Sequence, residues 1–237
     1  SKLNTVFLQL IVMVMSFAPL GVFCLIGKFV IVDGLDIFQD VFAYVVLLIA
    51  LLLFHAAFTY SLFLKIIGGL NPLTFFRKMK DVALFAFSTS SSAATIPVTL
   101  KTTNQDLGVN QNVASFVVPV GATINMDGTA IMQGLATVFI AQMSGIDLTL
   151  FQYIQVILLA VATSIGTAAV PSAGTITLII ILQQFNLPLE AIGIILAVDR
   201  VLDMIRTSVN VTGDAAIACI VAKTENQLDE NIFNSKA

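Results

Sequence analysis

The stretch DRVLDMIRTSVNVTGD, residues 199 to 214, decides how this chain can fold, because it carries three aspartates, two arginines and an asparagine in an otherwise apolar run. At about 100° per residue on a helix, Asp199, Asp203, Arg206, Asn210 and Asp214 fall within an arc of roughly 80°. An ionised group costs about 2.5 to 3.5 kcal/mol at the centre of a bilayer, even on a lenient scale. This row therefore cannot face lipid, and we expect it to line a polar cavity inside a membrane protein.

The composition of the whole chain supports a membrane protein. Hydrophobic residues make up 58% and charged residues 11% of the sequence, against about 45–50% and about 25% in soluble domains. The net charge of −3 argues against a nucleic-acid partner. Cys24 and Cys219 lie in apolar runs without ligand spacing, which favours free thiols. His55 stands alone in an apolar run, so we expect a packed histidine rather than a proton relay.

Six apolar segments organise the chain. We predict an all-α membrane protein made of transmembrane helices and two re-entrant helical hairpins. Acidic residues between 33 and 40 mark an outer loop, and basic residues between 65 and 80 mark a cytoplasmic loop. The predicted segments are spanning helices over 6–32 and 41–64, an inner hairpin over 82–112, a broken helix over 113–145, an outer hairpin over 154–186, the charged helix over 190–222 and a cytoplasmic tail over 224–237.

The two hairpins are predicted from polar runs in the middle of apolar segments, AFSTSSSAATIPVTL (86–100) and SIGTAAVPSAGT (164–175). Serine, glycine and threonine followed by proline end a helix and leave backbone groups without partners. Such backbone is tolerated at membrane depth only where it lines a cavity or is buried in protein. Two simple spans would leave the tail on the same side of the membrane, so parity alone does not decide between spans and hairpins.

An internal repeat strengthens the prediction. SSSAATIP (90–97) resembles SIGTAAVP (164–171), and NMDGT (125–129) resembles NVTGD (210–214). The chain thus contains a hairpin tip followed by an Asn-Gly helix break, twice over. Paired interruptions in corresponding halves point to the binding site of a secondary transporter. We expect an inverted repeat whose two tips meet near the midplane.

The residues at these interruptions suit hard cations, because they offer oxygen ligands and hardly any sulfur or imidazole. Asn125, Asp127 and Thr129 lie at the first break, and Asn210 and Asp214 supply the matching set. The alternative is that these motifs only kink two helices. The stretch 199–214 and Asp127 together hold four acids and two bases, so an anionic ligand should require cations bound beside it. This requirement is a physical reason for symport.

Arg206 is the candidate for specificity, since a guanidinium grips a carboxylate through two parallel hydrogen bonds. Asp203, one turn earlier, can hold an ammonium group, and the two together describe an acidic amino acid. The alternative is an internal Asp203–Arg206 ion pair, which the i,i+3 spacing allows. Backbone N–H groups at Ser91 and Ser92 are candidates for the main-chain carboxylate. We expect Arg200, which lies off the row, to pair with Asp199 or another acid.

SSSAATIPVT, GATINMDGT, SIGTAAVP and DMIRTSVNVTGD followed by AKTE resemble the sodium-coupled glutamate/aspartate transporter family (dicarboxylate/amino acid:cation symporters), in a microbial-type member. The resemblance runs over nearly the whole chain, with the four motifs in the right order. It implies a homotrimer in the plasma membrane, with multi-pass protomers that carry L-aspartate or L-glutamate and sodium ions by an elevator movement. Residues 1–40 would be a scaffold-type helix and 41–223 the transport domain. Further scaffold helices would precede residue 1.

The resemblance also assigns roles to individual residues. Arg206 would bind the side-chain carboxylate of the substrate and Asp203 its amino group. The other substrate contacts would be Ser91, Ser92, Thr129, Val170, Gly174, Thr207 and Asn210. The first sodium site would use Gly121, Asn125, Asn210 and Asp214; the second Thr123, Met126, Ser164, Ile165 and Thr167; and the third Asn125 and Asp127 with residues of an earlier helix.

Departures from the family pattern carry expectations of their own. Gln133 lies where proton-coupled members carry a glutamate, so we expect sodium coupling without that proton carrier. Ala169 and Ser172 replace glycines of the outer hairpin, which should stiffen it. Two competing functions are a sodium-coupled C4-dicarboxylate carrier and an anion-conducting channel. An enzyme is the weakest reading, because no Ser/His/Asp set, His-rich metal motif or phosphate loop is visible in the sequence.

Overall fold

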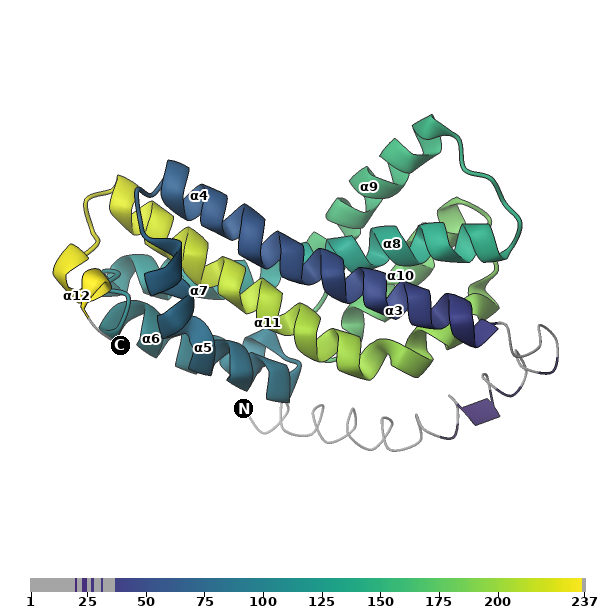
Figure 1. Cartoon of the computed structure of the whole chain (residues 1–237), viewed down its shortest axis with the longest axis horizontal. Helices are drawn as coiled ribbons and strands as arrows, with labels where there is room; N and C mark the ends of the chain where they lie inside the picture. The colour runs from purple at the N-terminus through teal and green to yellow at the C-terminus, as the bar shows by residue number, and fades with distance from the viewer. Residues whose placement is uncertain (1–19, 21–22, 25–26, 28–30, 32–36, 236–237) are drawn as a thin grey trace.

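The computed structural model of the chain describes residues 20, 23–24, 27, 31 and 37–235. Every regular element of secondary structure in this part of the chain is a helix (Figure 1). The predicted all-α class is confirmed for these residues. One helix among them, Phe38–Ile66, is long and apolar enough to cross a membrane. Most of the predicted scaffold-type helix, within 1–40, lies outside the described residues.

The first rod consists of α3 (Ile37–Phe54), a π-helical turn η1 (His55–Tyr60) and α4 (Ser61–Ile66), and it contains the predicted helix 41–64. The following elements are α5 (Pro72–Thr89), α6 (Ser92–Gln105), α7 (Gln111–Ile124), α8 (Asp127–Met143), α9 (Leu150–Ile165), α10 (Ala173–Gln184), a 3₁₀ turn η2 (Leu189–Ala191), α11 (Ile192–Thr224) and α12 (Glu230–Asn234).

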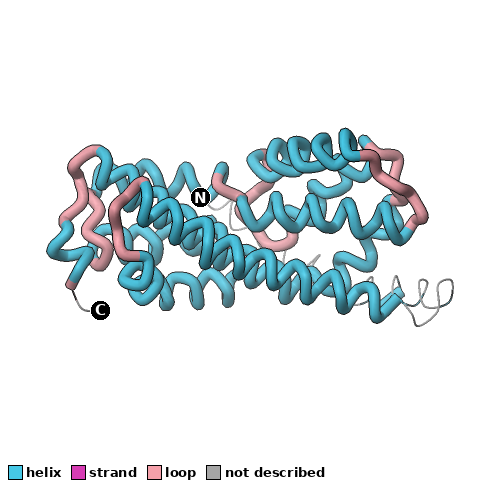
Figure 2. The backbone as a smooth tube through the Cα atoms, turned by 45° about the horizontal axis from the view of Figure 1, so that its top comes forward, coloured by secondary structure: helices cyan, strands magenta, loops and turns pink. Residues whose placement is uncertain are grey.

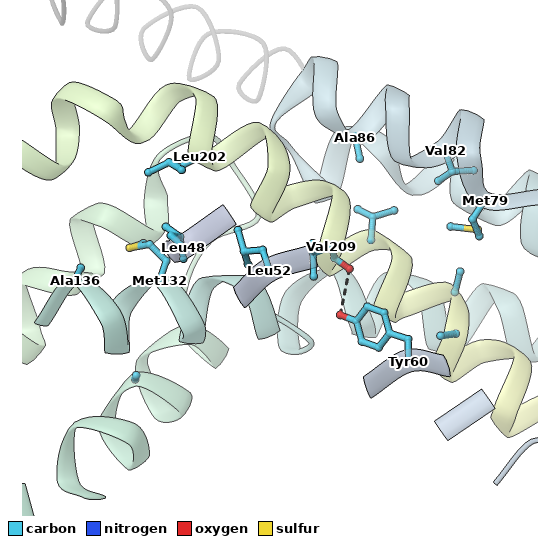
Figure 3. Close-up of a cluster of buried hydrophobic side chains, with 14 of the residues drawn as sticks. Leu48, Leu52, Tyr60, Met79, Val82, Ala86, Met132, Ala136, Leu202 and Val209 are labelled. Carbon is cyan, nitrogen blue, oxygen red and sulfur yellow. Dashed lines mark hydrogen bonds between the residues drawn. The ribbon is translucent and has the colours of Figure 1, made fainter. Parts of the chain in front are cut away.

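Helix α11 is the centre of the molecule. Its 33 residues give it a length of about 50 Å at about 1.5 Å per residue. It packs against α3, α5, α6, α7, α8 and α10, and it runs beside the α3–α4 rod in Figure 1. Figure 3 shows the apolar core along this contact, with Leu48 and Leu52 of α3, Met79 and Val82 of α5, and Leu202 of α11. The charged helix is therefore surrounded by protein along most of its length.

Helices α5 and α6, here called the first hairpin, pack on each other and are joined at Ser90 and Ser91. The prediction placed the start of this hairpin at residue 82, but α5 begins at Pro72. Asn71 caps the helix by accepting a hydrogen bond from the Leu73 N–H, and proline at the first helical position is pre-organised for a helix. Arg77, Lys78 and Lys80, predicted in a loop, therefore lie on α5.

Helices α9 and α10, the second hairpin, begin at Leu150 rather than at the predicted residue 154. Thr149 and Gln152 form a reciprocal capping box that starts α9. The tip spans 166–172, between the two helices. Pro171 precedes α10 as predicted, whereas Pro97, the corresponding residue of the repeat, lies inside α6. The first tip is thus made by Ser90 and Ser91 rather than by its proline.

One of the two predicted helix breaks is present. Helix α7 ends at Ile124 and α8 begins at Asp127, so the chain breaks at Asn125 and Met126. The second predicted break is wrong, because α11 is continuous through residues 210–214. Gly213 serves close packing instead: a Cβ there would lie 2.6 Å from the Tyr60 hydroxyl and 2.7 Å from Asn125 Nδ2. Glycine is needed at this position because two neighbouring side chains approach the helix backbone.

The tips of the two hairpins touch. Ser91 Oγ donates a hydrogen bond of 2.9 Å to the carbonyl of Ala169, and the N–H of Ala93 lies 3.4 Å from the same oxygen. In Figure 2, loop segments of the tips interrupt the helices in the middle of the molecule, away from the loops at its two ends. Two segments that lie more than 70 residues apart in sequence therefore enclose one side of α11.

Large apolar side chains cover the outward surface of α9. The exposed residues are Leu150, Phe151, Ile154, Ile157, Leu158, Val161 and Ile165. A contiguous apolar surface of this kind is typical of contact with lipid or with another protein segment rather than with water. The second hairpin thus presents its polar tip inward and an apolar helix outward.

Candidate functional site

A small cavity lies where the two tips, the break between α7 and α8, and α11 come together. Its volume is about 20 Å³, which is room for about one water molecule and less than any amino acid needs. It is lined by Ser90, Ser92, Met126, Thr129, Thr167, Ala168, Ala169, Val170, Gly174, Asp203, Arg206, Thr207 and Asn210. The structure thus brings together all the predicted substrate contacts except Ser91, whose hydroxyl bonds to Ala169 at the edge of the cavity.

Arg206 is the most deeply placed cation of the site, with 2% of the residue exposed. Its Nη2 donates a hydrogen bond of 2.5 Å to Asp203 Oδ1, and its Nη1 lies 3.5 Å from Asp199 Oδ1. The internal Asp203–Arg206 pair that the sequence left open is therefore present. The expected pairing of Arg200 with Asp199 is wrong, because Arg200 is exposed and Arg206 lies beside Asp199.

Both carboxylates next to Arg206 also hold the second hairpin. Asp203 Oδ2 accepts a hydrogen bond of 2.9 Å from the backbone N–H of Ser172. Asp199 Oδ1 accepts one of 2.6 Å from the hydroxyl of Thr175. Ser172 has a φ of 59°, a left-handed conformation that costs a residue with a Cβ more than it costs glycine. The acids of α11 therefore anchor a strained turn of the hairpin across the cavity.

Asn210 ties α11 to the broken helix. Its Oδ1 accepts a hydrogen bond of 2.7 Å from the backbone N–H of Gly128, and its Nδ2 lies 3.4 Å from Thr129 Oγ1. A Cβ at Gly128 would lie 3.0 Å from both Arg206 Cγ and Asn210 Oδ1. The glycine of the NMDGT motif thus allows α8 to approach α11 closely.

The first predicted sodium set is largely assembled. Asn125 Nδ2 donates a hydrogen bond of 3.0 Å to Asp214 Oδ1, and Asp214 is 1% exposed. Gly121 faces the same carboxylate so closely that a Cβ would lie 2.6 Å from Asp214 Oδ1. The buried carboxylate of Asp214 thus has the Asn125 amide as its hydrogen-bond donor and no cationic side chain beside it among the described residues. Such a carboxylate suits a small cation, because a buried charge must be compensated. Asn210, the fourth member of the set, turns toward Gly128 instead.

The second predicted sodium set is only partly brought together. Met126 and Thr167 line the cavity, and Ser164 is buried. Thr123 and Ile165 are exposed, and the hydroxyls of Thr123 and Ser164 each bond to a carbonyl of their own helix. These residues would need to rearrange before they could share one ion.

Asp127, from the third predicted set, has two partners that sequence reasoning did not assign to it, His55 and Tyr60. Asp127 Oδ2 lies 3.1 Å from His55 Nε2 and accepts a hydrogen bond of 3.0 Å from the Tyr60 hydroxyl. Tyr60 also lies 3.2 Å from the carbonyl oxygen of Val209, the contact that is dashed in Figure 3. His55 is thus half-buried at the contact with α8, and its polar partner Asp127 was not predicted. His55 and Tyr60 begin and end η1, and a π-helical turn often marks a functional site.

Gln133 was noted in the sequence only for its neutral side chain. The residue is fully buried on α8, and its Nε2 donates hydrogen bonds to the Gly174 carbonyl (3.0 Å) and to Thr177 Oγ1 (2.7 Å). Its Oε1 accepts a hydrogen bond of 2.8 Å from Thr163. One amide thus bridges α8 to both helices of the second hairpin.

Comparison with known proteins now decides the class of protein. The sodium:dicarboxylate symporter family matches residues 1–224. The chain belongs to this family. It is 42% identical to excitatory amino acid transporter 2 of Homo sapiens over 221 residues, which cover 92% of this chain and 38% of the relative. It is 41% identical to an excitatory amino acid transporter of Caenorhabditis elegans over 221 residues, covering 92% and 44%, and 40% identical to excitatory amino acid transporter 3 of Mus musculus over 238 residues, covering 100% and 46%.

Membership of the symporter family places the chain among membrane transporters and not among enzymes. The apolar outer surface of α9 agrees with that setting. The chain spans less than half the length of the curated relatives it matches. Within that length it holds the tips, the broken helix and the charged helix that enclose the cavity.

Proposed function

We propose that this chain forms the substrate- and ion-binding part of a transporter that carries L-aspartate or L-glutamate with sodium ions across the plasma membrane. One observation supports this proposal above the others. A guanidinium and a carboxylate, those of Arg206 and Asp203, are paired inside a cavity closed by two hairpin tips. An acidic amino acid carries the two complementary charges, so it can replace both halves of this pair.

The replacement assigns a role to each side of the cavity. The side-chain carboxylate of the substrate takes the place of Asp203 at Arg206, and its ammonium takes the place of Arg206 and the Ser172 N–H at Asp203. Thr129, Thr207 and Asn210 hold the polar atoms between these charges. Ser91, Ser92 and the backbone of Val170 and Gly174 hold the main-chain carboxylate, because they lie in or directly beside the two tips.

The proposed coupling to sodium rests on the balance of charge in the site. Two carboxylates, those of Asp199 and Asp203, contact Arg206, and Asp127 and Asp214 add two more negative charges on the helices that form the site, so a further anion is unfavourable there without added cations. Asp214 with Asn125 and Gly121 forms the best prepared cation site, and Asp127, whose charged neighbour is His55 rather than an arginine, supplies a further carboxylate. The family name also includes sodium as the coupled ion.

Movement is required because the cavity is too small for the proposed substrate. We propose that the second hairpin opens to admit it and that both hairpins are re-entrant, related as an inverted repeat. Residues 41–223 would then move as a transport domain in an elevator mechanism, within a homotrimer that supplies the fixed scaffold. The exposed apolar face of α9 would slide against that scaffold or against lipid.

Uptake into proteoliposomes tests the proposal directly. The full chain is reconstituted, and labelled L-aspartate and L-glutamate are supplied outside with an inward sodium gradient or with choline in its place. Saturable uptake with sodium and its loss in choline are expected. Equal uptake in both buffers would contradict sodium coupling, and a current without substrate exchange would indicate a channel.

A second candidate is a sodium-coupled C4-dicarboxylate carrier, because the family description names dicarboxylates. Asp203 separates the two, since only a substrate with an ammonium group needs this carboxylate. In Asp203→Asn we expect aspartate affinity to fall roughly 100-fold, the scale on which loss of a charged hydrogen bond acts, while succinate binds better than in the unmodified chain. Tighter binding of succinate than of aspartate before the substitution would instead favour the carrier.

A further inference from the structure

Asp199 holds a position between the second hairpin and Arg206. The residue is 2% exposed and lies on α11, two turns before Arg206. Its Oδ1 accepts the 2.6 Å hydrogen bond from Thr175 of α10, and the same oxygen lies 3.5 Å from Arg206 Nη1. One carboxylate oxygen is therefore shared by the hydroxyl of a hairpin residue and by the guanidinium proposed to bind substrate.

The sharing is unequal. The contact with Thr175 is a short hydrogen bond, whereas the contact with Arg206 is an ion pair whose Nη1 has no hydrogen-bond partner among the residues that the structure describes. The other oxygen of Asp199, Oδ2, also lacks a partner there. A buried carboxylate and a buried guanidinium at this distance gain free energy by closing the gap, because both are under-satisfied. The hydroxyl of Thr175 competes with that closure.

We propose that Asp199 is a positioning residue that adjusts the hold of Arg206 on the substrate according to the position of the second hairpin. With the hairpin closed, Thr175 satisfies Oδ1, and Arg206 stays available to the carboxylate of the substrate. With the hairpin open, Thr175 leaves, and Asp199 draws the guanidinium toward itself. Opening thus weakens the grip on the substrate and favours its release. This inference rests on the proposed function, because it concerns the same arginine.

The variant Thr175→Val tests the step, since it keeps the shape of the side chain and removes the hydroxyl. We expect aspartate affinity to fall roughly tenfold, the scale of one hydrogen bond to a charged group. Thr175→Ser should restore affinity to within about twofold, because it returns the donor. Thr137→Val is the matched control: Thr137 is equally buried, but its hydroxyl bonds only to the Gln133 carbonyl of its own helix, so affinity should not change.

A double-mutant cycle with Asp199→Asn separates positioning from a general packing effect. If Thr175 acts through the charge of Asp199, Thr175→Val should lower affinity less than threefold in the Asp199→Asn background. An equal loss in both backgrounds, or no rescue by serine, would overturn the inference.

Amide hydrogen exchange without substrate extends the test to a protein that binds no aspartate. Exchange at residues 172–176 should rise in Thr175→Val and rise no further when Asp199→Asn is added. Absence of sodium-dependent aspartate binding in the unmodified chain would overturn the proposed function. The exchange cycle would still decide whether Thr175 and Asp199 are coupled, and additive exchange rates would overturn that coupling.

Discussion

The two hairpins have similar tips but are held in place in different ways. Each tip contains a serine in the left-handed conformation, Ser90 with a φ of 52° and Ser172 with a φ of 59°. Ser90 lines the cavity beside Arg206, and Ser172 bonds to Asp203 at its edge. The difference lies in where the remaining contacts of each hairpin are made, far from the cavity in one and within it in the other.

The first hairpin is anchored at its base. Lys78 Nζ donates hydrogen bonds to the carbonyls of Asp106 (2.9 Å) and Ile232 (2.7 Å) and to Ser235 Oγ (3.1 Å). The segment after α11 also pairs with the loop that follows α6, through the hydrogen bond of 2.8 Å from the Asp229 N–H to the Gly108 carbonyl. None of these contacts involves a residue proposed to bind substrate, so a ligand cannot loosen them directly.

The second hairpin is anchored at its tip, by Asp203 and Asp199 of α11 and by Gln133 of α8. Its α9 helix turns an exposed apolar surface outward and projects away from the other helices in Figure 1. The ammonium group of a substrate would compete for Asp203 and so replace one of these anchors. The comparison teaches that the second hairpin, which is anchored at and beside the cavity, is the one whose position a bound ligand can influence.

The largest effect is expected from Arg206→Ala, which leaves Asp203 and Asp199 without their shared cation. Loss of one partner of a buried ion pair costs about 3–5 kcal/mol, so aspartate binding should fall at least ~100-fold. Amide exchange at the second tip should rise, while exchange at the first tip stays unchanged. Isothermal titration with aspartate and hydrogen exchange measure the two results.

Two arginine variants control this prediction. Arg200→Ala changes an exposed arginine of the same helix and should leave aspartate affinity within about twofold. Arg206→Lys keeps the charge but loses the two-pronged geometry, so it should bind more weakly than the unmodified chain and better than the alanine variant. Unchanged aspartate affinity in Arg206→Ala would remove the assignment of an acidic substrate.

A smaller effect is expected from Gln133→Leu, which removes the bridge from α8 to both helices of the second hairpin. The Gly174 carbonyl and the hydroxyls of Thr163 and Thr177 each lose one hydrogen bond and keep another, so the expected cost is that of a typical hydrogen bond, about 0.5–1.5 kcal/mol. Amide exchange in α10 should rise roughly tenfold without a change in α5 and α6. Gln142→Leu, at an exposed position of the same helix, is the control. Equal loosening of both hairpins would contradict the comparison.

The sequence was most informative where charge and chain-breaking residues leave few physical alternatives. The row from Asp199 to Asp214 could not face lipid, and the structure buries all five of its predicted members. The break at Asn125 and the contact between the two tips were predicted from the repeated motifs and are present. These features depend on local chemistry or on a strong penalty, so a single sequence displays them.

The parts that were missed depend on packing between segments distant in sequence. NVTGD resembles NMDGT, yet α11 continues through Gly213, whose missing Cβ leaves room for Tyr60. The partners of Asp127 and of Asp199, namely His55 and Thr175, lie more than 20 residues away from them on other helices. Asn71 and Pro72 form a typical helix start, and α5 begins there. The basic residues that follow them had favoured the prediction of a loop.

The smallest effect on the site is expected from Lys78→Met, which tests the anchored base of the first hairpin. The substitution keeps most of the side-chain volume and removes all three hydrogen bonds to the loop after α6 and to the C-terminal segment. Two carbonyls, those of Asp106 and Ile232, lose a charged donor, so amide exchange at residues 106–110 and 227–235 should rise by an amount equivalent to about 1–3 kcal/mol. Aspartate affinity should change less than about twofold, because Lys78 lies outside the cavity lining.

Lys80→Met is the matched control for this variant, since Lys80 is exposed two residues further along α5 and should leave exchange in both regions unchanged. The informative comparison is between the base and the tips. Faster exchange confined to the base would mean that the first hairpin is held by contacts independent of the substrate. If Lys78→Met instead loosened the second tip and weakened aspartate binding as much as Gln133→Leu does, the two hairpins would form one cooperative unit. The distinction between a hairpin held independently of the substrate and a hairpin coupled to the binding site would then fail.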